Sequence, residues 1–337
     1  MKEGHFLERV ALGLTMHSVS RIGVGLAALG RPGYINIGHS TDLKDGLDIE
    51  SMRQRAHSVL DVAWESGVRY FDVARSYGRA EEFLGSWLVS RGIPRESVTV
   101  GSKWGYTYTA DWKVQLPPGE RHEIKDHSLP VLDRQTVESR EILGEYLDVY
   151  QIHSATIESG VLSNGEVLSR LAELRDAGTT IGFSVSGPRQ SDTIRRGLEI
   201  ERNGRPLFEA VQATWNLLEQ SATDALSEAH AQGRGIIVKE ALANGRLTPR
   251  AETSILASNP QLGEFAKENE VTLDAIAIAA AMHQPWSSVV LSGAATIEHL
   301  QSNLAAVKID VSKLTGLVQF AEPSETYWQN RAGLAWN

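Results

Sequence analysis

The chain has 337 residues, of which 42% are hydrophobic and 22% charged, as in globular proteins with a substantial core. A net charge of −9 disfavours a nucleic-acid binder, because such binding draws on clustered lysine and arginine. Without cysteine there is no disulfide, thiol nucleophile or cysteine-ligated zinc. The chain has no signal-peptide core and no apolar run that could span a membrane, so we expect a cytoplasmic protein that binds neither nucleic acid nor membrane.

Strand and helix patterns alternate along the chain, which is typical of a parallel sheet. A hairpin is predicted at 9–20. Eight strands are predicted at 21–26, 68–73, 97–102, 147–153, 179–185, 208–214, 234–240 and 286–293. Helices are predicted at 52–67, 80–92, 134–144, 165–178, 191–200, 222–233, 273–284 and 297–307. Eight such units are expected to close as one (β/α)8 TIM barrel over residues 1–337, with the hairpin at its bottom and long loops, 30–50 and 104–132, at its C-terminal mouth.

Four polar residues fall at the ends of three successive predicted strands. Asp72 and Tyr77 follow the apolar run VRYF, Lys103 follows the next strand, and His153 ends the strand after that. The carboxyl ends of barrel strands meet at one mouth, where the active sites of such folds lie. We therefore expect the four side chains to converge.

This pattern resembles the aldo-keto reductases. The resemblance also includes SRIGVGLAALG, IGFSVSG, EAVQATWN and LSGAATIEHLQSNLAA, and so covers nearly the whole chain. It implies a catalytic tetrad of Asp72, Tyr77, Lys103 and His153 that interconverts a small-molecule carbonyl (aldehyde, ketone or keto-sugar) and an alcohol. Tyr77 would be the general acid/base, Lys103 would ease loss of its proton, Asp72 would hold Lys103, and His153 would orient the substrate oxygen.

None of these four residues can supply a hydride, so a nicotinamide cofactor is expected. The resemblance implies that it is bound by Gly25, Leu26, Asp72, Ser184, Gln212, Lys239, Glu240, Ala241, Leu242, Gly293, Thr296, His299 and Asn303. Lys239 and Glu240 depart from the family, because many relatives carry an aromatic-Ser-Pro-Leu segment there. Thr296 and His299 stand where NADP-specific relatives have a basic residue. On family frequency NADP(H) is slightly favoured over NAD(H).

The 104–132 connection is rich in aromatic residues, and aromatic faces suit cyclic or sugar-like ligands. With the C-terminal tail it is expected to wall the substrate pocket through Trp104, Tyr106, Trp112 and Trp328. The alternative is an aromatic lid that only packs on the barrel.

Other motifs are less informative. GVGLAA at 23–28 fits a loose dinucleotide fingerprint, but glycine and proline follow where a Rossmann helix should begin. HEIKDH at 122–127 spaces its histidines five apart, whereas the zinc motif needs four, so no metal is expected. Two alternatives to a reductase are a non-catalytic NADP-binding regulatory subunit of the same fold and a barrel hydrolase. The hydrolase is disfavoured because neither a metal motif nor a nucleophile elbow is present.

Overall fold

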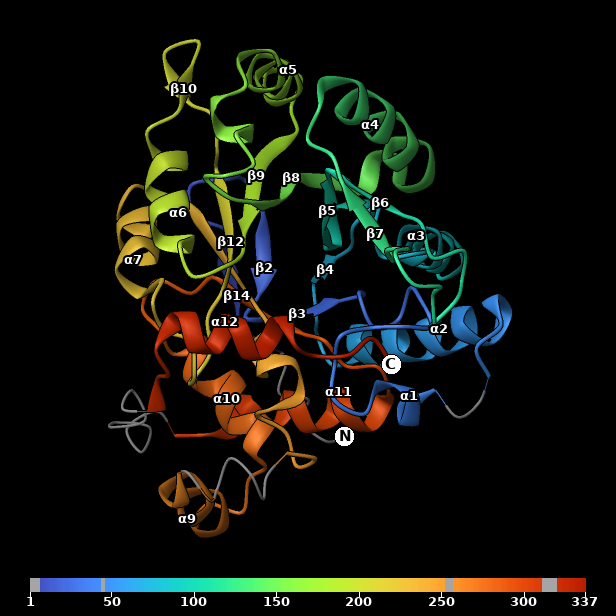
Figure 1. The fold of residues 1–337 in the computed structure, drawn as a ribbon, viewed down its shortest axis with the longest axis vertical. Coiled ribbons are helices and arrows are strands. Elements are labelled where there is room, and N and C mark those ends of the chain that lie inside the picture. The colour runs from blue at the N-terminus through green and yellow to red at the C-terminus, as the bar shows by residue number, and fades with distance from the viewer. Residues whose placement is uncertain (1–6, 44–45, 252–256, 258, 311–319) are drawn as a thin grey trace.

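The computed structural model describes residues 7–43, 46–251, 257, 259–310 and 320–337. Eight parallel strands close into a barrel in chain order, with helices around it (Figure 1). The barrel strands are β3 (Ile22–Gly25), β4 (Tyr70–Asp72), β5 (Thr99–Trp104), β8 (Leu147–Ala155), β9 (Thr180–Val185), β12 (Ala210–Thr214), β13 (Gly235–Lys239) and β14 (Val289–Ser292). The predicted TIM barrel and all eight of its predicted strands are therefore confirmed.

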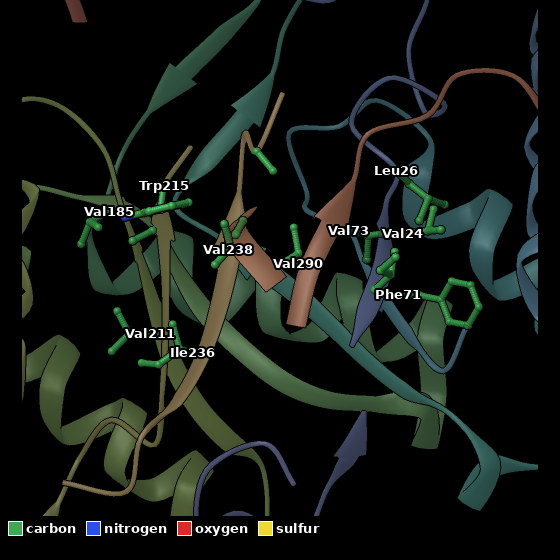
Figure 2. Packing of buried hydrophobic residues seen from close by; sticks show 14 of the residues in the cluster. Val24, Leu26, Phe71, Val73, Val185, Val211, Trp215, Ile236, Val238 and Val290 are labelled. Carbon is green, nitrogen blue, oxygen red and sulfur yellow. The ribbon is translucent and has the colours of Figure 1, made fainter. Parts of the chain in front are cut away.

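The helices around the barrel make its strands fully buried, which explains why the strand sequences are continuous apolar runs. Figure 2 shows the layer between strands and helices, with Val24, Phe71 and Val238 among the packed side chains. The helices are α1 (His39–Asp42), α2 (Ile49–Glu65), α3 (Ala80–Ser90), α4 (Leu129–Leu143), α5 (Gly165–Asp176), α6 (Gln190–Leu198), α7 (Thr223–Ala231), α9 (Pro260–Glu268), α10 (Leu273–Met282), α11 (Ile297–Leu304) and α12 (Ser324–Ala332). None in the described part of the chain is long and apolar enough to cross a membrane.

The predicted N-terminal hairpin is present as β1 (Arg9–Ala11) paired antiparallel with β2 (Ser18–Ser20). Leu12 and Val19 of this hairpin join an interior cluster with Tyr70 and Ile237. A Cβ atom at Gly235, the first residue of β13, would lie only 2.5 Å from Cγ of Leu12, so the hairpin packs directly against the start of this strand. The hairpin therefore closes the end of the barrel where the strands begin.

The connections hold more structure than the sequence indicates. The 104–132 segment contains an antiparallel pair, β6 (Tyr106–Tyr108) and β7 (Glu123–Lys125), and α4 begins before the predicted helix. Strand β5 extends to Trp104, so Lys103 lies inside the strand and not after it. A further short pair, β10 (Glu201–Arg202) and β11 (Arg205–Pro206), precedes β12. The 3-10 turns are η1 (Arg95–Ser97), η2 (Gly144–Tyr146), η3 (Val161–Ser163), η4 (Ala243–Gly245) and η5 (Ala305–Lys308).

Candidate active site

A cavity opens at the C-terminal mouth of the barrel, where the strand ends converge. Three of the four predicted catalytic residues line it, and the fourth lies directly beneath. Charged, polar and aromatic side chains line it, among them Arg31, Tyr34, Asp72, Tyr77, Glu123, His153, Gln212, Lys239, Glu240, Arg331 and Trp336.

Asp72 and Lys103 form a buried ion pair on the neighbouring strands β4 and β5. Only 2% of Asp72 and 1% of Lys103 is exposed. The ammonium of Lys103 pairs with Oδ1 of Asp72 and donates to the carbonyl of Val73 at 3.0 Å. A buried charge persists only when it is paired and hydrogen-bonded, so each residue keeps the other charged.

The second oxygen of Asp72 is also held. Nε2 of Gln212 donates to Oδ2 at 2.9 Å, and Oη of Tyr70 lies 3.5 Å away. A Cβ at Gly101, beside Asp72 in the β4–β5 register, would lie 2.5 Å from Oη of Tyr70. Glycine at this position therefore leaves room for Tyr70 and the Asp72 carboxylate.

Tyr77 follows β4, and its ring lies between the other members of the cluster. Nζ of Lys103 is 4.9 Å from the centre of this ring, and the ring of His153 is 5.5 Å away, edge-on. Burial raises the pKa of Tyr77 well above its usual value, and Asp72 raises it further. The charge of Arg31, whose guanidinium lies 5.5 Å from the ring centre, acts in the opposite direction and lowers the pKa of Tyr77.

His153 is presented by an irregularity in β8. The register with β9 shifts between Ile152 and Ala155, and Ser154 has a φ of 51°, in the left-handed region. Such bulges re-aim side chains next to active sites. Burial lowers the pKa of His153 well below its usual value, and Lys103 lowers it further, so the ring is neutral.

Most of the predicted cofactor residues line one of two adjoining cavities. Gly25, Asp72, Gln212, Lys239, Glu240, Ala241, Leu242 and Gly293 line the cavity at the mouth. His299 and Asn303 line a second cavity, which shares Asn36, Leu242 and Gly293 with the first. Thr296 caps α11 and lines a third cavity. Leu26 is fully buried and, like Ser184, does not line any of these cavities.

The residues present fit a nicotinamide group. Oε1 of Gln212 is buried and has no hydrogen-bond partner, while its Nε2 is engaged by Asp72. An unpaired acceptor costs free energy, and an amide N–H of a carboxamide would satisfy it. Oγ of Ser184 accepts from the backbone N–H of Ser154 at 2.8 Å.

At the end of β13 the residues that depart from the family form an ionic cluster. Lys239 donates to Oγ1 of Thr214 at 2.7 Å, and burial lowers its pKa to about 8. Nε of Arg331 donates to Glu240 at 2.9 Å. Although burial raises the pKa of Glu240, Arg331 and Lys239 outweigh this effect and hold it at about 2. The position of the stacking aromatic is therefore taken by charged groups.

None of the four predicted substrate residues lines the cavity. Trp104 is fully buried in the core, and Trp328 is 8% exposed within the same cluster. The indole N–H of Trp112 donates to the carbonyl of Leu47 at 2.5 Å. Tyr106 packs on His153, with ring centres 4.8 Å apart. The aromatic residue that lines the cavity from the C-terminal tail is Trp336.

The residues that sequence reasoning missed come from the long connections and the tail. Arg31, Tyr34 and Arg331 belong to no motif found in the sequence. Glu123 lies in the HEIKDH segment, which sequence reasoning set aside, and Trp336 lies in the C-terminal tail, which was expected to wall the substrate pocket. The zinc-like HEIKDH segment is divided among different partners. His122 stacks on Trp336, Glu123 pairs with Arg31, and His127 binds the carbonyl of His153.

The fold and the site thus combine an eight-stranded barrel with a buried Asp–Lys pair that lies beside a tyrosine and a neutral histidine at its mouth. The model of the Aldo/keto reductase family matches residues 21–315. The chain therefore belongs to the aldo/keto reductase family. It is an oxidoreductase of a family that uses nicotinamide cofactors.

Individual relatives agree with this assignment. Over 336 residues the chain is 27% identical to pyridoxal 4-dehydrogenase of Microbacterium luteolum, covering 88% of this chain and 92% of that protein. It is 23% identical over 331 residues to NADH-specific methylglyoxal reductase of Escherichia coli strain K12, covering 91% and 95%. An aldo-keto reductase of Bacillus halodurans, solved in its holo form, has a TM-score of 0.67 at 20% identity and covers 94% of this chain and 97% of its own. That structure supports the barrel fold.

Proposed function

We propose that this protein interconverts a carbonyl and an alcohol with Tyr77 as the general acid/base. The observation that carries the proposal is the contact between three parts of one cluster: the Asp72–Lys103 ion pair, the Tyr77 ring above Lys103, and His153 edge-on to Tyr77. All lie at or directly beneath a cavity that opens at the mouth of the barrel.

The proposed role of each residue in the cluster follows from its charge. A bound nicotinamide cofactor supplies or accepts the hydride. In reduction the substrate oxygen gains negative charge, and Tyr77 donates a proton to it. The ammonium of Lys103, kept charged by Asp72, stabilises the tyrosinate that this transfer leaves. Because His153 is neutral, its ring can donate a hydrogen bond to the oxygen without adding a charge.

The test is to replace Tyr77 and measure chemistry and binding separately. Tyr77→Phe is expected to lower kcat by at least ~10², the lower end of general acid catalysis. The Kd for reduced cofactor, from nicotinamide fluorescence, should change little. Lys103→Met should also inactivate the enzyme. Turnover that survives both substitutions would place the chemistry elsewhere.

The same assay separates the reductase from a non-catalytic regulatory subunit of the same fold. The subunit would bind cofactor and show no turnover with any aldehyde, keto-sugar or alcohol in either direction. We further propose a cyclic or sugar-like substrate, because aromatic and charged side chains share the cavity wall. A cytoplasmic location is also part of the proposal.

A further inference from the structure

The two adjoining cavities form one path from the tetrad to helix α11. They share Asn36, Leu242 and Gly293, and the second cavity is lined by Arg250, His299 and Asn303. A dinucleotide bound along this path with its nicotinamide at Gln212 would direct its adenosine half toward α11. The inference below rests on the proposed function, because it concerns which dinucleotide this path accepts.

A buried carboxylate stands beside this path and lines the third cavity together with Thr296. Asp42 belongs to α1, in the long connection after β3, and only 3% of its side chain is exposed. Arg250 binds it through both terminal nitrogens, with Nη1 at 2.9 Å from Oδ2. Nε2 of His299 lies 3.7 Å from Oδ1. Among the described residues that line the second cavity, the basic side chains are thus both turned to Asp42.

We propose that Asp42 makes this enzyme select NAD(H) over NADP(H). The adenosine ribose of NADP(H) carries a 2′-phosphate, which needs cationic partners near Thr296 and His299. To bind Arg250, the phosphate has two options. It can displace Asp42, which leaves a buried carboxylate unpaired, or it can lie beside Asp42 and be repelled by its charge. The 2′-hydroxyl of NAD(H) is a hydrogen-bond donor, and a carboxylate accepts from it.

Asp42 is fixed in place by contacts around the ion pair. Arg250 also donates to the carbonyl of Gly38 at 2.8 Å, which ties it to the turn before α1. The N–H of Ile37 donates to the carbonyl of Asn244 at 3.0 Å, and Nδ2 of Asn244 donates to the carbonyl of Ile35 at 3.0 Å. Displacing the carboxylate therefore disturbs the packing of two loops, whereas an exposed ion pair would yield easily.

The experiment measures the Kd of NADH and of NADPH for the purified protein by nicotinamide fluorescence. The wild type should bind NADH at least about tenfold more tightly than NADPH. Asp42→Asn keeps the shape of the side chain and removes its charge. It should therefore lower the Kd for NADPH and reduce the ratio of the NADPH Kd to the NADH Kd about tenfold or more. Adding Arg250→Gln to Asp42→Asn should reverse this gain, because the freed guanidinium is what binds the phosphate.

The matched control is Glu228→Gln, which removes the charge from an exposed pair with Arg195 on the helices outside the barrel. It should leave the ratio unchanged. The proposal is overturned if the wild type binds NADPH as tightly as NADH. It is also overturned if Asp42→Asn folds and its ratio of NADPH Kd to NADH Kd equals that of the wild type. Should that variant not fold, the wild-type ratio still decides. Failure to bind either cofactor would overturn the proposed function as well.

Discussion

Arg31 places a positive charge against the proposed acid/base. Its guanidinium lies 5.5 Å from the centre of the Tyr77 ring and 4.7 Å from that of Trp336. Nη1 donates to the carbonyl of Ser76 at 2.8 Å and to Glu123 at 2.9 Å. Because only 3% of Arg31 is exposed, its field at Tyr77 is weakly screened by solvent.

Arg31 and Glu123 should therefore tune Tyr77 in opposite directions. Arg31 lowers the pKa of Tyr77 and Glu123 raises it. Alcohol oxidation needs the tyrosinate, so Arg31→Met should move the acid limb of the kcat profile to higher pH and Glu123→Gln should move it to lower pH. Each pH unit of movement changes the rate on that limb about tenfold. If both variants move the acid limb in the same direction, the Arg31–Glu123 pair acts only by holding its two connections in place and not through its charges.

The sequence was informative for the tetrad and not for Arg31. Asp72, Lys103 and His153 lie in the C-terminal parts of barrel strands, where the barrel dictates which side chains meet, so their convergence follows from the order of the strands. Arg31 and Asp42 lie in a connection whose path depends on contacts with residues more than 200 positions away, such as Arg250. No local pattern encodes those contacts.

At the scale of elements, the β6–β7 pair and the segment around α12 together build the outer wall of the cavity. The ring of His122 stacks on Trp336 with centres 4.1 Å apart, and Arg331 of α12 pairs with Glu240 at the end of β13. The substrate wall thus joins two segments some 200 positions apart in the chain.

Trp336→Ala tests whether this wall of the cavity contributes to substrate specificity. The variant should raise KM for a cyclic or sugar-like substrate about tenfold, which corresponds to the upper end of the ~0.5–1.5 kcal/mol that an aromatic pair contributes beyond burial. Its kcat for a propanal-sized aldehyde should be spared. Trp328→Phe is the matched control, because Trp328 is buried in the core outside the cavity and its replacement should lower Tm without changing KM. Equal losses for both substrates would make Trp336 part of a structural lid.

Prediction from the sequence misplaced aromatic side chains of the connections, because such side chains can pack either in the core or in a ligand pocket. A tryptophan in a connection gains free energy by burial in the core as readily as in a ligand pocket. Trp104 extends β5 and enters the core, and Trp112 packs edge-on against Phe83 of α3. By contrast, the eight strands were predictable because burial on both faces requires continuous apolar runs. The GVGLAA fingerprint proved to be part of barrel strand β3 and the turn after it.

On the scale of the whole molecule, buried histidines link stability to pH. Burial lowers the pKa of His39 to about 4 and that of His127 to about 4. Above about pH 6.5 each is neutral whether folded or unfolded. As pH falls below 6.5 the unfolded chain takes up protons that the folded chain does not, so each such histidine costs about 1.4 kcal/mol per pH unit until its folded pKa is reached.

His39→Phe should flatten this dependence. His39 is fully buried with an edge-on contact to Tyr34, and phenylalanine has a similar shape. Urea unfolding between pH 6.5 and 5 should show the free energy of unfolding falling about 1.4 kcal/mol per pH unit less steeply in the variant. Exposed His230→Gln serves as the control. An unchanged slope in His39→Phe would show that His39 does not titrate differently in the two states.

The hairpin that closes the bottom of the barrel has a consequence for turnover. With Leu12 and Val19 packed across the end where the strands begin, ligands reach the cavity from the opposite end of the barrel. Two ligands that share one entrance cannot exchange independently. Whichever lies deeper has to arrive first and depart last, so the shape of the barrel imposes a sequence on binding and release.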